Sequence, residues 1–211
     1  MSNNRSRQSL LIDIGKDCFF AGNLVQYRNS VTVEGLNSYG AHWNKVTGCK
    51  GGTEMFGNFN IGIMGSGNIA GIMAGTINKM KNVRVYAVAS RQQVHADVFA
   101  GKYGCKKAYG SYADLVADKK VDLIYVATPH SEHYENVKMC LEAGKPVLCE
   151  KAFTLNAAQA EELVRIAAEH KVFLAEAMWT RYMPMLTTIR EVIGSGIIGE
   201  PKTLTANLGY V

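Results

Sequence analysis

From residue 58 to about residue 180, short apolar segments alternate with segments of helical periodicity, and this alternation restricts the fold more than any other feature. The apolar segments have the length of strands and few polar side chains, so both faces of each strand should be buried. Strands of this kind form a parallel sheet with helices on both sides. The sequence therefore predicts a doubly wound α/β domain. Its expected strands are Asn60–Met64, Val83–Ala89, Lys106–Tyr109, Leu123–Ala127, Pro146–Cys149 and Val172–Ala177.

Short polar side chains precede three of the expected helices. Ser111, Ser131 and Asn156 are each followed by a helical segment, and side chains of these types cap helix N-termini. Gly144 predicts the end of the helix that Ser131 would begin. The expected helices cover about residues 68–79, 92–103, 112–117, 132–143 and 157–170.

The two ends of the chain follow other patterns. Residues 1–57 show neither helical nor strand periodicity and are rich in Asn, Ser and Gly, so we expect a poorly ordered extension. Residues 181–211 predict one amphipathic helix, Pro184–Ile193, followed by one alternating strand, Thr203–Tyr210. Because one strand cannot bury a face alone, we interpret this segment as the start of a second α+β domain that is truncated here.

The segment Lys50–Met55 gives a hypothesis about the first residues. One DNA sequence that encodes this segment contains a purine-rich stretch that resembles a bacterial ribosome-binding site. That stretch lies a short spacer ahead of the codon for Met55, which can act as a start codon. Met55 also lies just before the first expected strand. We therefore hypothesise that residues 1–54 are translated leader and that Met55 is the natural start; the alternative is a genuine extension. Mass spectrometry of the protein from its native cell tests this, since a peptide from upstream of Met55 would contradict it.

The segment Gly65–Ala70 follows the first expected strand, opens a helix and fits the pattern G-x-G-x-x-A. Gly65 permits a tight turn, Gly67 lets the backbone approach a pyrophosphate, and Ala70 allows the helix to pack closely on the strand. The amide groups at the start of the helix favour a phosphate. This context predicts a dinucleotide site in a Rossmann fold, whereas a glycine turn without a ligand is the plainer alternative. The candidate contacts are Gly65, Ser66, Gly67, Asn68 and Ile69.

The end of the second expected strand indicates which dinucleotide is bound. NAD sites usually place Asp or Glu there for the ribose hydroxyls, but this chain has Ala89-Ser90-Arg91. Ser90 can donate a hydrogen bond to a 2′-phosphate and Arg91 can neutralise its charge. The sequence therefore favours NADP, with NAD possible. The alternative is that Arg91 is an ordinary surface residue.

Polar residues also follow three later strands, and in an open parallel sheet ligands bind at these carboxyl ends. Together with the earlier motifs, their order resembles the Gfo/Idh/MocA oxidoreductases over about residues 58–211, nearest the dihydrodiol dehydrogenase and NADP-linked xylose dehydrogenase branch. The motifs are G-x-G-x-x-A, A-S-R, T-P-x-x-x-H, G-K-P-V-x-x-E-K and E-A-M-W-T-R-Y. The chain departs from the family at Ala152, where the usual residue is a proline, which would stiffen the loop.

The resemblance implies roles for the residues at these strand ends. Lys151 takes the place of the family's catalytic lysine, which moves a proton on or off the substrate oxygen beside the nicotinamide. Without the resemblance, Lys151 would be interpreted as a surface lysine paired with Glu150. Trp179 could equally be a core aromatic residue at the domain junction. Further implied cofactor contacts are Thr128, Pro129, His130, His133, Glu150, Lys151, Trp179 and Arg181.

A metal site is the alternative for His130 and His133, which are three residues apart at a helix start. No third ligand is evident nearby, so we expect no metal. The five cysteines are widely spaced without C-x-x-C, which favours a reducing, cytoplasmic compartment. The net charge of +5 is dispersed, so nucleic acid is not an expected partner. No apolar stretch is long enough to span a membrane.

The leading hypothesis is an NADP-dependent oxidoreductase that transfers a hydride between nicotinamide and a sugar or cyclic polyol. This chain would hold the cofactor-binding half, inactive as such a fragment, and the full-length form is expected to be a homo-oligomer. A non-catalytic nucleotide-binding or regulatory module is the second hypothesis, and a truncated gene product without its own function is the third.

Overall fold

The computed structural model describes residues 59–207 and residue 209. The expectations for residues 1–57, the leader and Met55 included, lie outside this range. The chain divides after Glu176 into two compact units, an N-terminal unit and a C-terminal unit, and each is described by itself.

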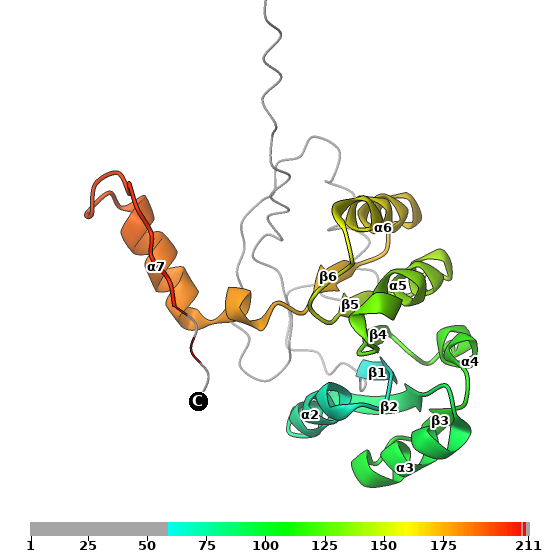
Figure 1. Cartoon of the computed structure of the whole chain (residues 1–211). Helices are drawn as coiled ribbons and strands as arrows, with labels where there is room; N and C mark the ends of the chain where they lie inside the picture. Colours follow the sequence, from blue (N-terminus) through cyan, green and yellow to red (C-terminus); the bar gives the residue numbers. More distant parts are fainter. Residues whose placement is uncertain (1–58, 208, 210–211) are drawn as a thin grey trace, which may run out of the picture. The chain divides into compact units, whose positions relative to one another are not determined.

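The N-terminal unit is built on a parallel sheet of six strands in the order β3-β2-β1-β4-β5-β6 (Figure 1). The chain passes from β1 outward to β3 and then returns to the other side of β1 to form β4, β5 and β6. The point where the strand order reverses therefore lies between β1 and β4, and such a point leaves a crevice at the carboxyl ends of the strands. The strands are β1 (Phe59–Met64), β2 (Val83–Ala89), β3 (Lys107–Tyr109), β4 (Leu123–Val126), β5 (Val147–Cys149) and β6 (Leu174–Glu176).

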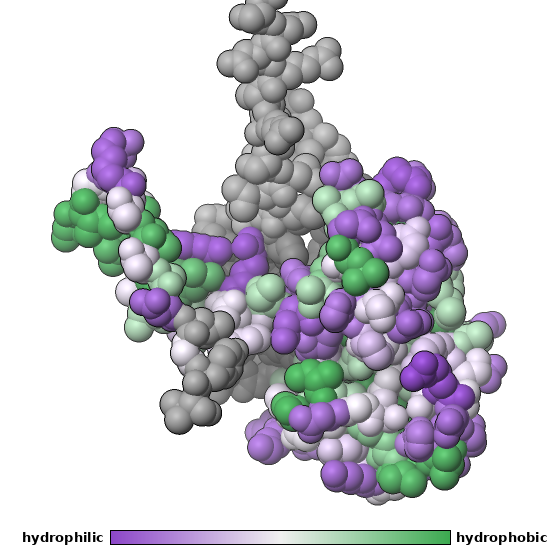
Figure 2. Space-filling view, in the orientation of Figure 1, coloured by the Kyte–Doolittle hydropathy of each residue, from purple (hydrophilic) through white to green (hydrophobic). Residues whose placement is uncertain are grey.

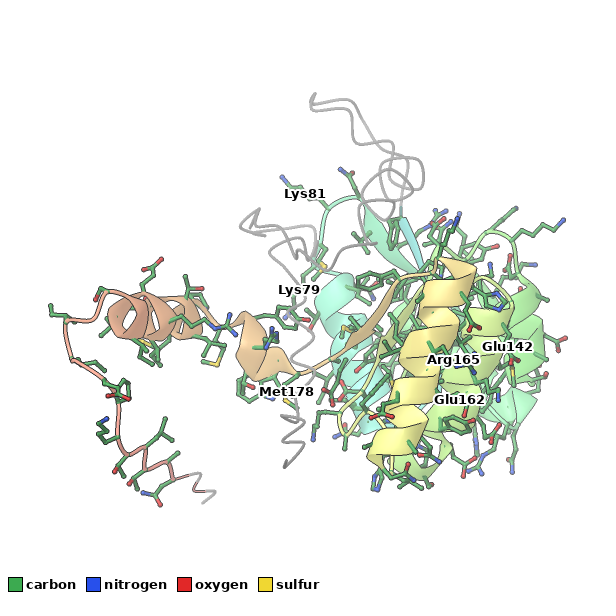
Figure 3. The ribbon with its side chains drawn as sticks, turned by 90° about the horizontal axis from the view of Figure 1, so that it is seen from above. Lys79, Lys81, Glu142, Glu162, Arg165 and Met178 are labelled. Atoms are coloured by element: carbon green, nitrogen blue, oxygen red, sulfur yellow. The ribbon has the colours of Figure 1, made fainter. Side chains whose placement is uncertain are left out.

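Helices pack on this sheet in two groups, with α2 against α3 and α5 against both α4 and α6. Glu162 and Arg165 project from α6 (Figure 3), and Glu162 pairs with Lys138 of α5 at 2.9 Å. The hydrogen bonds from Lys138 and Tyr134 lower the pKa of the Glu162 carboxyl. The helices are α2 (Asn68–Ile77), α3 (Gln93–Tyr103), α4 (Tyr112–Ala117), α5 (His133–Glu142) and α6 (Ala157–His170).

Both faces of the sheet are buried, as the apolar strands predict. One core cluster joins Met64 of β1 to Leu115 of α4, Leu141 of α5 and Leu163 of α6. The next residue back along β1, Ile63, is fully buried without belonging to that cluster. Because successive strand residues point to opposite faces, β1 is covered on both sides. The predicted doubly wound α/β fold is confirmed.

The helix starts agree with the expected caps only in part. Asn156 is the N-cap of α6, and its side chain accepts a hydrogen bond from the Gln159 amide at 3.0 Å. Ser111 is the N-cap of α4, but its side chain makes no capping bond. Ser131 lies inside a short 3₁₀ helix, η1 (His130–Glu132), so α5 begins later than predicted. Gly144 follows α5 in a left-handed conformation, which ends the helix as expected.

The C-terminal unit contains a 3₁₀ helix, η2 (Trp179–Tyr182), and the helix α7 (Pro184–Gly194). The strand predicted over Thr203–Tyr210 is not formed at residues 203–207, and the remainder of that segment falls outside the described range or at its edge. A strand needs a neighbour for its backbone hydrogen bonds. Figure 2 shows apolar surface over α7, and its exposed apolar residues are Met185, Ile189, Val192 and Ile193.

Replacement of Asn156 by alanine should lower the free energy of unfolding by about 1 kcal/mol, because the first turn of α6 loses its side-chain acceptor. Ser111→Ala is the matched control and should change stability by less than about 0.5 kcal/mol, since Ser111 makes no capping bond. Urea denaturation measures both. Equal losses in the two variants would contradict the capping assignment.

Candidate dinucleotide site and its lysine loop

The turn between β1 and α2 is fixed by backbone contacts to both neighbouring strands. The Gly65 amide donates to the Ala89 carbonyl at the end of β2 at 2.8 Å. The Ala127 amide, after β4, donates to the Met64 carbonyl at 2.9 Å. Gly65 has a φ of 105°, and a Cβ there would lie 2.7 Å from the Ala127 oxygen. Only glycine fits this position.

Gly67 is glycine for a different reason. It is the N-cap of α2 in an extended conformation, and a Cβ built on it meets nothing within 4 Å. A side chain there would project into open space. No side chain caps α2 and no acidic residue lies in its first turn, while Asn68 and Ile69 are exposed. The first amide groups of the helix are thus available to an anion, so the turn fits a pyrophosphate.

Ser66 connects this turn to the end of β2. Its hydroxyl donates to the Ser90 hydroxyl at 3.2 Å. Ser90 is buried, and its amide donates to the Tyr109 carbonyl of β3 at 3.0 Å. Arg91 is exposed directly after it. The pKa of Tyr112 is raised by burial, and the positive charge of Arg91 partly offsets that rise, which locates Arg91 near this tyrosine. Two hydroxyl groups therefore meet beside the glycine turn, and Arg91 follows them in the sequence.

The residues after β4 form a second part of the site. Thr128 is buried, and its hydroxyl accepts a hydrogen bond from the Asn136 side chain at 3.0 Å. Pro129 and His130 are exposed. His133 has 1% of its surface exposed, and its two ring nitrogens each lie 2.9 Å from a carbonyl oxygen. Nε2 contacts Thr128 and Nδ1 contacts Ala152, so this histidine joins the loop after β4 to the loop after β5.

The contacts of His133 leave neither ring nitrogen directed at a metal. Each nitrogen faces a carbonyl oxygen. Which of the two nitrogens carries a hydrogen depends on the tautomer of the ring. Across the described residues, no group of three His, Cys, Asp or Glu side chains is placed to hold a metal ion. His133 is instead a structural connection between two strand ends.

Glu150, at the end of β5, is a buried carboxylate with both oxygens hydrogen-bonded. Oε1 accepts from the Tyr125 hydroxyl at 2.5 Å, and Oε2 accepts from the Lys151 amide at 3.1 Å. Burial and this hydrogen bond raise the pKa of the Tyr125 hydroxyl well above its usual value, so Tyr125 remains a donor. A buried carboxylate needs such partners, because unpaired burial of a charge is costly.

Lys151 itself is exposed, beside the ends of β4 and β5. The Lys151–Ala152 peptide bond is cis. After it, the Phe153 amide donates to Glu176 Oε1, at the end of β6, at 3.0 Å. The backbone of this loop is thus tied to neighbouring strands while the ammonium group faces outward, where it is able to meet a ligand.

The structure brings most of the predicted site residues to one edge of the sheet, at the ends of β1, β2, β4 and β5. Trp179 and Arg181 lie in η2 of the C-terminal unit, and Trp179 is 63% exposed. Sequence reasoning did not single out Tyr125 or Asn136, and it placed Glu176 in the motif E-A-M-W-T-R-Y without giving it a role. Tyr125 was hidden in an apolar strand, and Asn136 is one helical turn from His133, which is the only signal of its position.

A glycine turn that opens an uncapped helix at the reversal point of a parallel sheet defines a dinucleotide-binding domain of the Rossmann type. Residues 59–178 match the Gfo/Idh/MocA group, described as an oxidoreductase family with an NAD-binding Rossmann fold. The chain belongs to the Gfo/Idh/MocA oxidoreductase family.

Curated relatives match the chain in its N-terminal part. It is 61% identical over 102 residues to a D-xylose 1-dehydrogenase (NADP(+)) of Hypocrea jecorina, covering 48% of this chain and 26% of that protein. It is 40% identical over 151 residues to a trans-1,2-dihydrobenzene-1,2-diol dehydrogenase of Mus musculus, covering 71% of this chain and 45% of that protein. The chain thus spans less than half the length of these two relatives.

Solved structures share the fold. An NAD-binding oxidoreductase from Klebsiella pneumoniae matches with a TM-score of 0.64 and 32% identity, over 68% of this chain and 40% of that one. A 3-ketoreductase from Actinomadura kijaniata, in complex with NADP, matches with a TM-score of 0.62 and 30% identity, over 68% of this chain and 46% of that one.

The two glycines of the turn should respond differently to alanine. Gly65→Ala should destabilise the fold by about 1–3 kcal/mol, because its positive φ and the nearby Ala127 oxygen exclude a Cβ. Gly67→Ala should cost less than about 1 kcal/mol, because its Cβ meets open space. It should nevertheless weaken NADPH binding by at least about tenfold, which corresponds to about 1.4 kcal/mol.

Thermal unfolding measures the stability of both variants, and fluorescence titration measures NADPH affinity. Normal NADPH affinity in a folded Gly67→Ala protein would contradict the placement of the pyrophosphate over this residue.

Proposed function

We propose that this chain binds NADP(H) and forms the cofactor-binding part of an oxidoreductase that acts on a sugar, cyclic polyol or diol. The observation that carries the proposal is the open space above Gly67 at the uncapped start of α2. Ser66 of the same turn is hydrogen-bonded to Ser90, which Arg91 follows in the sequence. The named activities of the two curated relatives support the substrate class.

In this proposal the turn and the residues after β2 bind the adenosine end of the cofactor. The pyrophosphate lies at the start of α2, where the amide groups and the helix dipole favour negative charge. Ser90 and Arg91 hold the 2′-phosphate. Neither Ala89, Ser90 nor Arg91 has a carboxylate that would repel that phosphate or select the free 2′-hydroxyl.

The strand ends after β4 and β5 hold the other end of the cofactor. Thr128, Pro129, His130, His133 and Glu150 line or support this part. When bound, the nicotinamide supplies hydride chemistry. Lys151 holds the substrate oxygen and passes a proton to it or takes one from it. An exposed lysine on a firmly held loop supports the enzyme over a non-catalytic module.

The proposal extends to the rest of the protein. Residues 181–211 begin a second α+β domain that carries substrate contacts, and Trp179 and Arg181 contribute to the cofactor site. The substrate is a small molecule, and neither nucleic acid nor a membrane is a partner. No helix among the described residues has the length and apolar character to cross a membrane. The cytoplasm as location is supported by the free thiols of Cys105, Cys140 and Cys149, and the full-length protein is a homo-oligomer.

Arg91→Ala should weaken NADPH binding by about tenfold or more and leave NADH binding nearly unchanged, because only NADPH has the 2′-phosphate that the guanidinium holds. Fluorescence titration of the purified chain with each nucleotide measures this. Arg165→Ala is the matched control, since Arg165 is exposed on α6 and pairs with Glu169. Equal losses for both nucleotides would contradict the NADP assignment.

The same preparation, given NADP⁺ with D-xylose or with a trans-dihydrodiol, tests hydride transfer through the appearance of NADPH, and as a fragment it is expected to form little or none. A failure of the folded wild-type chain to bind either nucleotide would overturn the proposed function.

A further inference from the structure

One peptide group beside Lys151 is held on both of its edges. His133 Nδ1 lies 2.9 Å from the Ala152 carbonyl oxygen, and the Phe153 amide donates to Glu176 Oε1 at 3.0 Å. The Ala152 carbonyl and the Phe153 amide belong to the same peptide group. A donor on one edge and a carboxylate on the other polarise that group in the same sense, so each contact strengthens the other.

Both side chains that hold this peptide group are themselves fixed. His133 is 1% exposed, and its Nε2 lies 2.9 Å from the Thr128 carbonyl. A second contact at the far end of the ring sets the orientation of the imidazole. Glu176 is the last residue of β6 and pairs in the sheet with Cys149, the last residue of β5. The imidazole is therefore held at both ends, and the backbone of Glu176 is part of the sheet.

The backbone on the other side of Lys151 is held as well. Its amide donates to Glu150 Oε2, and Glu150 Oε1 accepts from the buried Tyr125 hydroxyl. The lysine backbone is therefore enclosed between held groups, while its side chain is exposed. A lysine side chain is flexible along its four methylenes, so the position of its backbone decides which part of the site the ammonium reaches.

We propose that His133 and Glu176 are positioning residues for Lys151, which act by holding the Ala152–Phe153 peptide group. The inference rests on the proposed function, because it assigns Lys151 to the reacting end of a bound NADP(H). His133 does not touch the reacting atoms. Its Nδ1 contact with the Ala152 carbonyl sets the lysine loop, and its Nε2 contact with the Thr128 carbonyl sets the imidazole.

Two substitutions at His133 separate these contacts. The asparagine amide nitrogen is as many bonds from Cβ as Nδ1 of histidine, so His133→Asn keeps a donor for Ala152. The glutamine amide nitrogen is as many bonds from Cβ as Nε2, so His133→Gln places an N–H at the Thr128 carbonyl and none at the Ala152 carbonyl. Glu176→Gln and Glu176→Met form a second pair, because glutamine keeps an oxygen acceptor for the Phe153 amide.

Two measurements on the whole chain read the position of the loop. Amide hydrogen exchange over residues 151–155 should accelerate by about fivefold in His133→Gln and Glu176→Met, the effect of one lost hydrogen bond, and much less in His133→Asn and Glu176→Gln. Labelling of Lys151 by an amine-reactive reagent should be slowed by NADPH in the wild type. That protection should fall by about fivefold in the same two variants. Lys171, exposed at the end of α6, is the internal control.

The affinity for 2′,5′-ADP, which occupies only the adenosine end, should stay the same in all four variants. Equal behaviour of asparagine and glutamine at position 133 in both measurements would overturn the inference, since a packing role does not distinguish their donors. If the His133 variants do not fold, the Glu176 pair decides by the same criterion. If the wild type binds no nucleotide, the proposed function fails, and the exchange measurement still decides whether the loop is anchored as described.

Discussion

Two backbone hydrogen bonds at the end of β1 determine where the whole site lies. The Gly65 amide reaches the end of β2, and the Met64 carbonyl receives the amide that follows β4. The glycine turn is therefore held between the two strands that flank β1. Since the strand order reverses here, the turn after β1 and the lysine loop after β5 both lie at the carboxyl ends of the strands, which is where parallel sheets of this kind bind ligands.

The two halves of the site use different physical means. After β1 and β2, the groups available to a ligand carry partial or full positive charge. They are the first amides of α2, the hydroxyl hydrogens of the two serines and the Arg91 guanidinium. At β4 and β5, most polar groups are already paired with one another, through Thr128, His133 and Glu150. The first half is arranged to attract a charged ligand. The second is arranged to keep one lysine in place.

Sequence patterns predicted the fold closely, because apolar periodicity and glycine turns are local signals. The bounds of β2 and α6 agree with the predicted segments, and the Asn156 cap is confirmed. The Ser131 cap was wrong, because a 3₁₀ turn precedes α5, and the strand over residues 203–207 was wrong, because pairing is a non-local property.

The candidate site was predictable where residues belong to a motif, as with Gly65, Ser90 and Lys151. The supporting contacts were not. From the sequence, Tyr125 is one more residue of an apolar strand, and Glu176 is the first residue of a motif without a role of its own. The sheet places them beside Glu150 and Phe153. Contacts between residues this far apart in the chain depend on strand order, which no local pattern contains.

The contacts that hold the loop after β5 are made to its main-chain atoms, so they place few demands on its side chains. The groups that His133 and Glu176 hold are both main-chain groups, the Ala152 carbonyl and the Phe153 amide. Proline and alanine both provide that carbonyl, and neither alters the amide that follows. The contacts of this loop to His133 and Glu176 therefore do not depend on whether position 152 is alanine or proline, and the side chain there can differ while the main chain stays held.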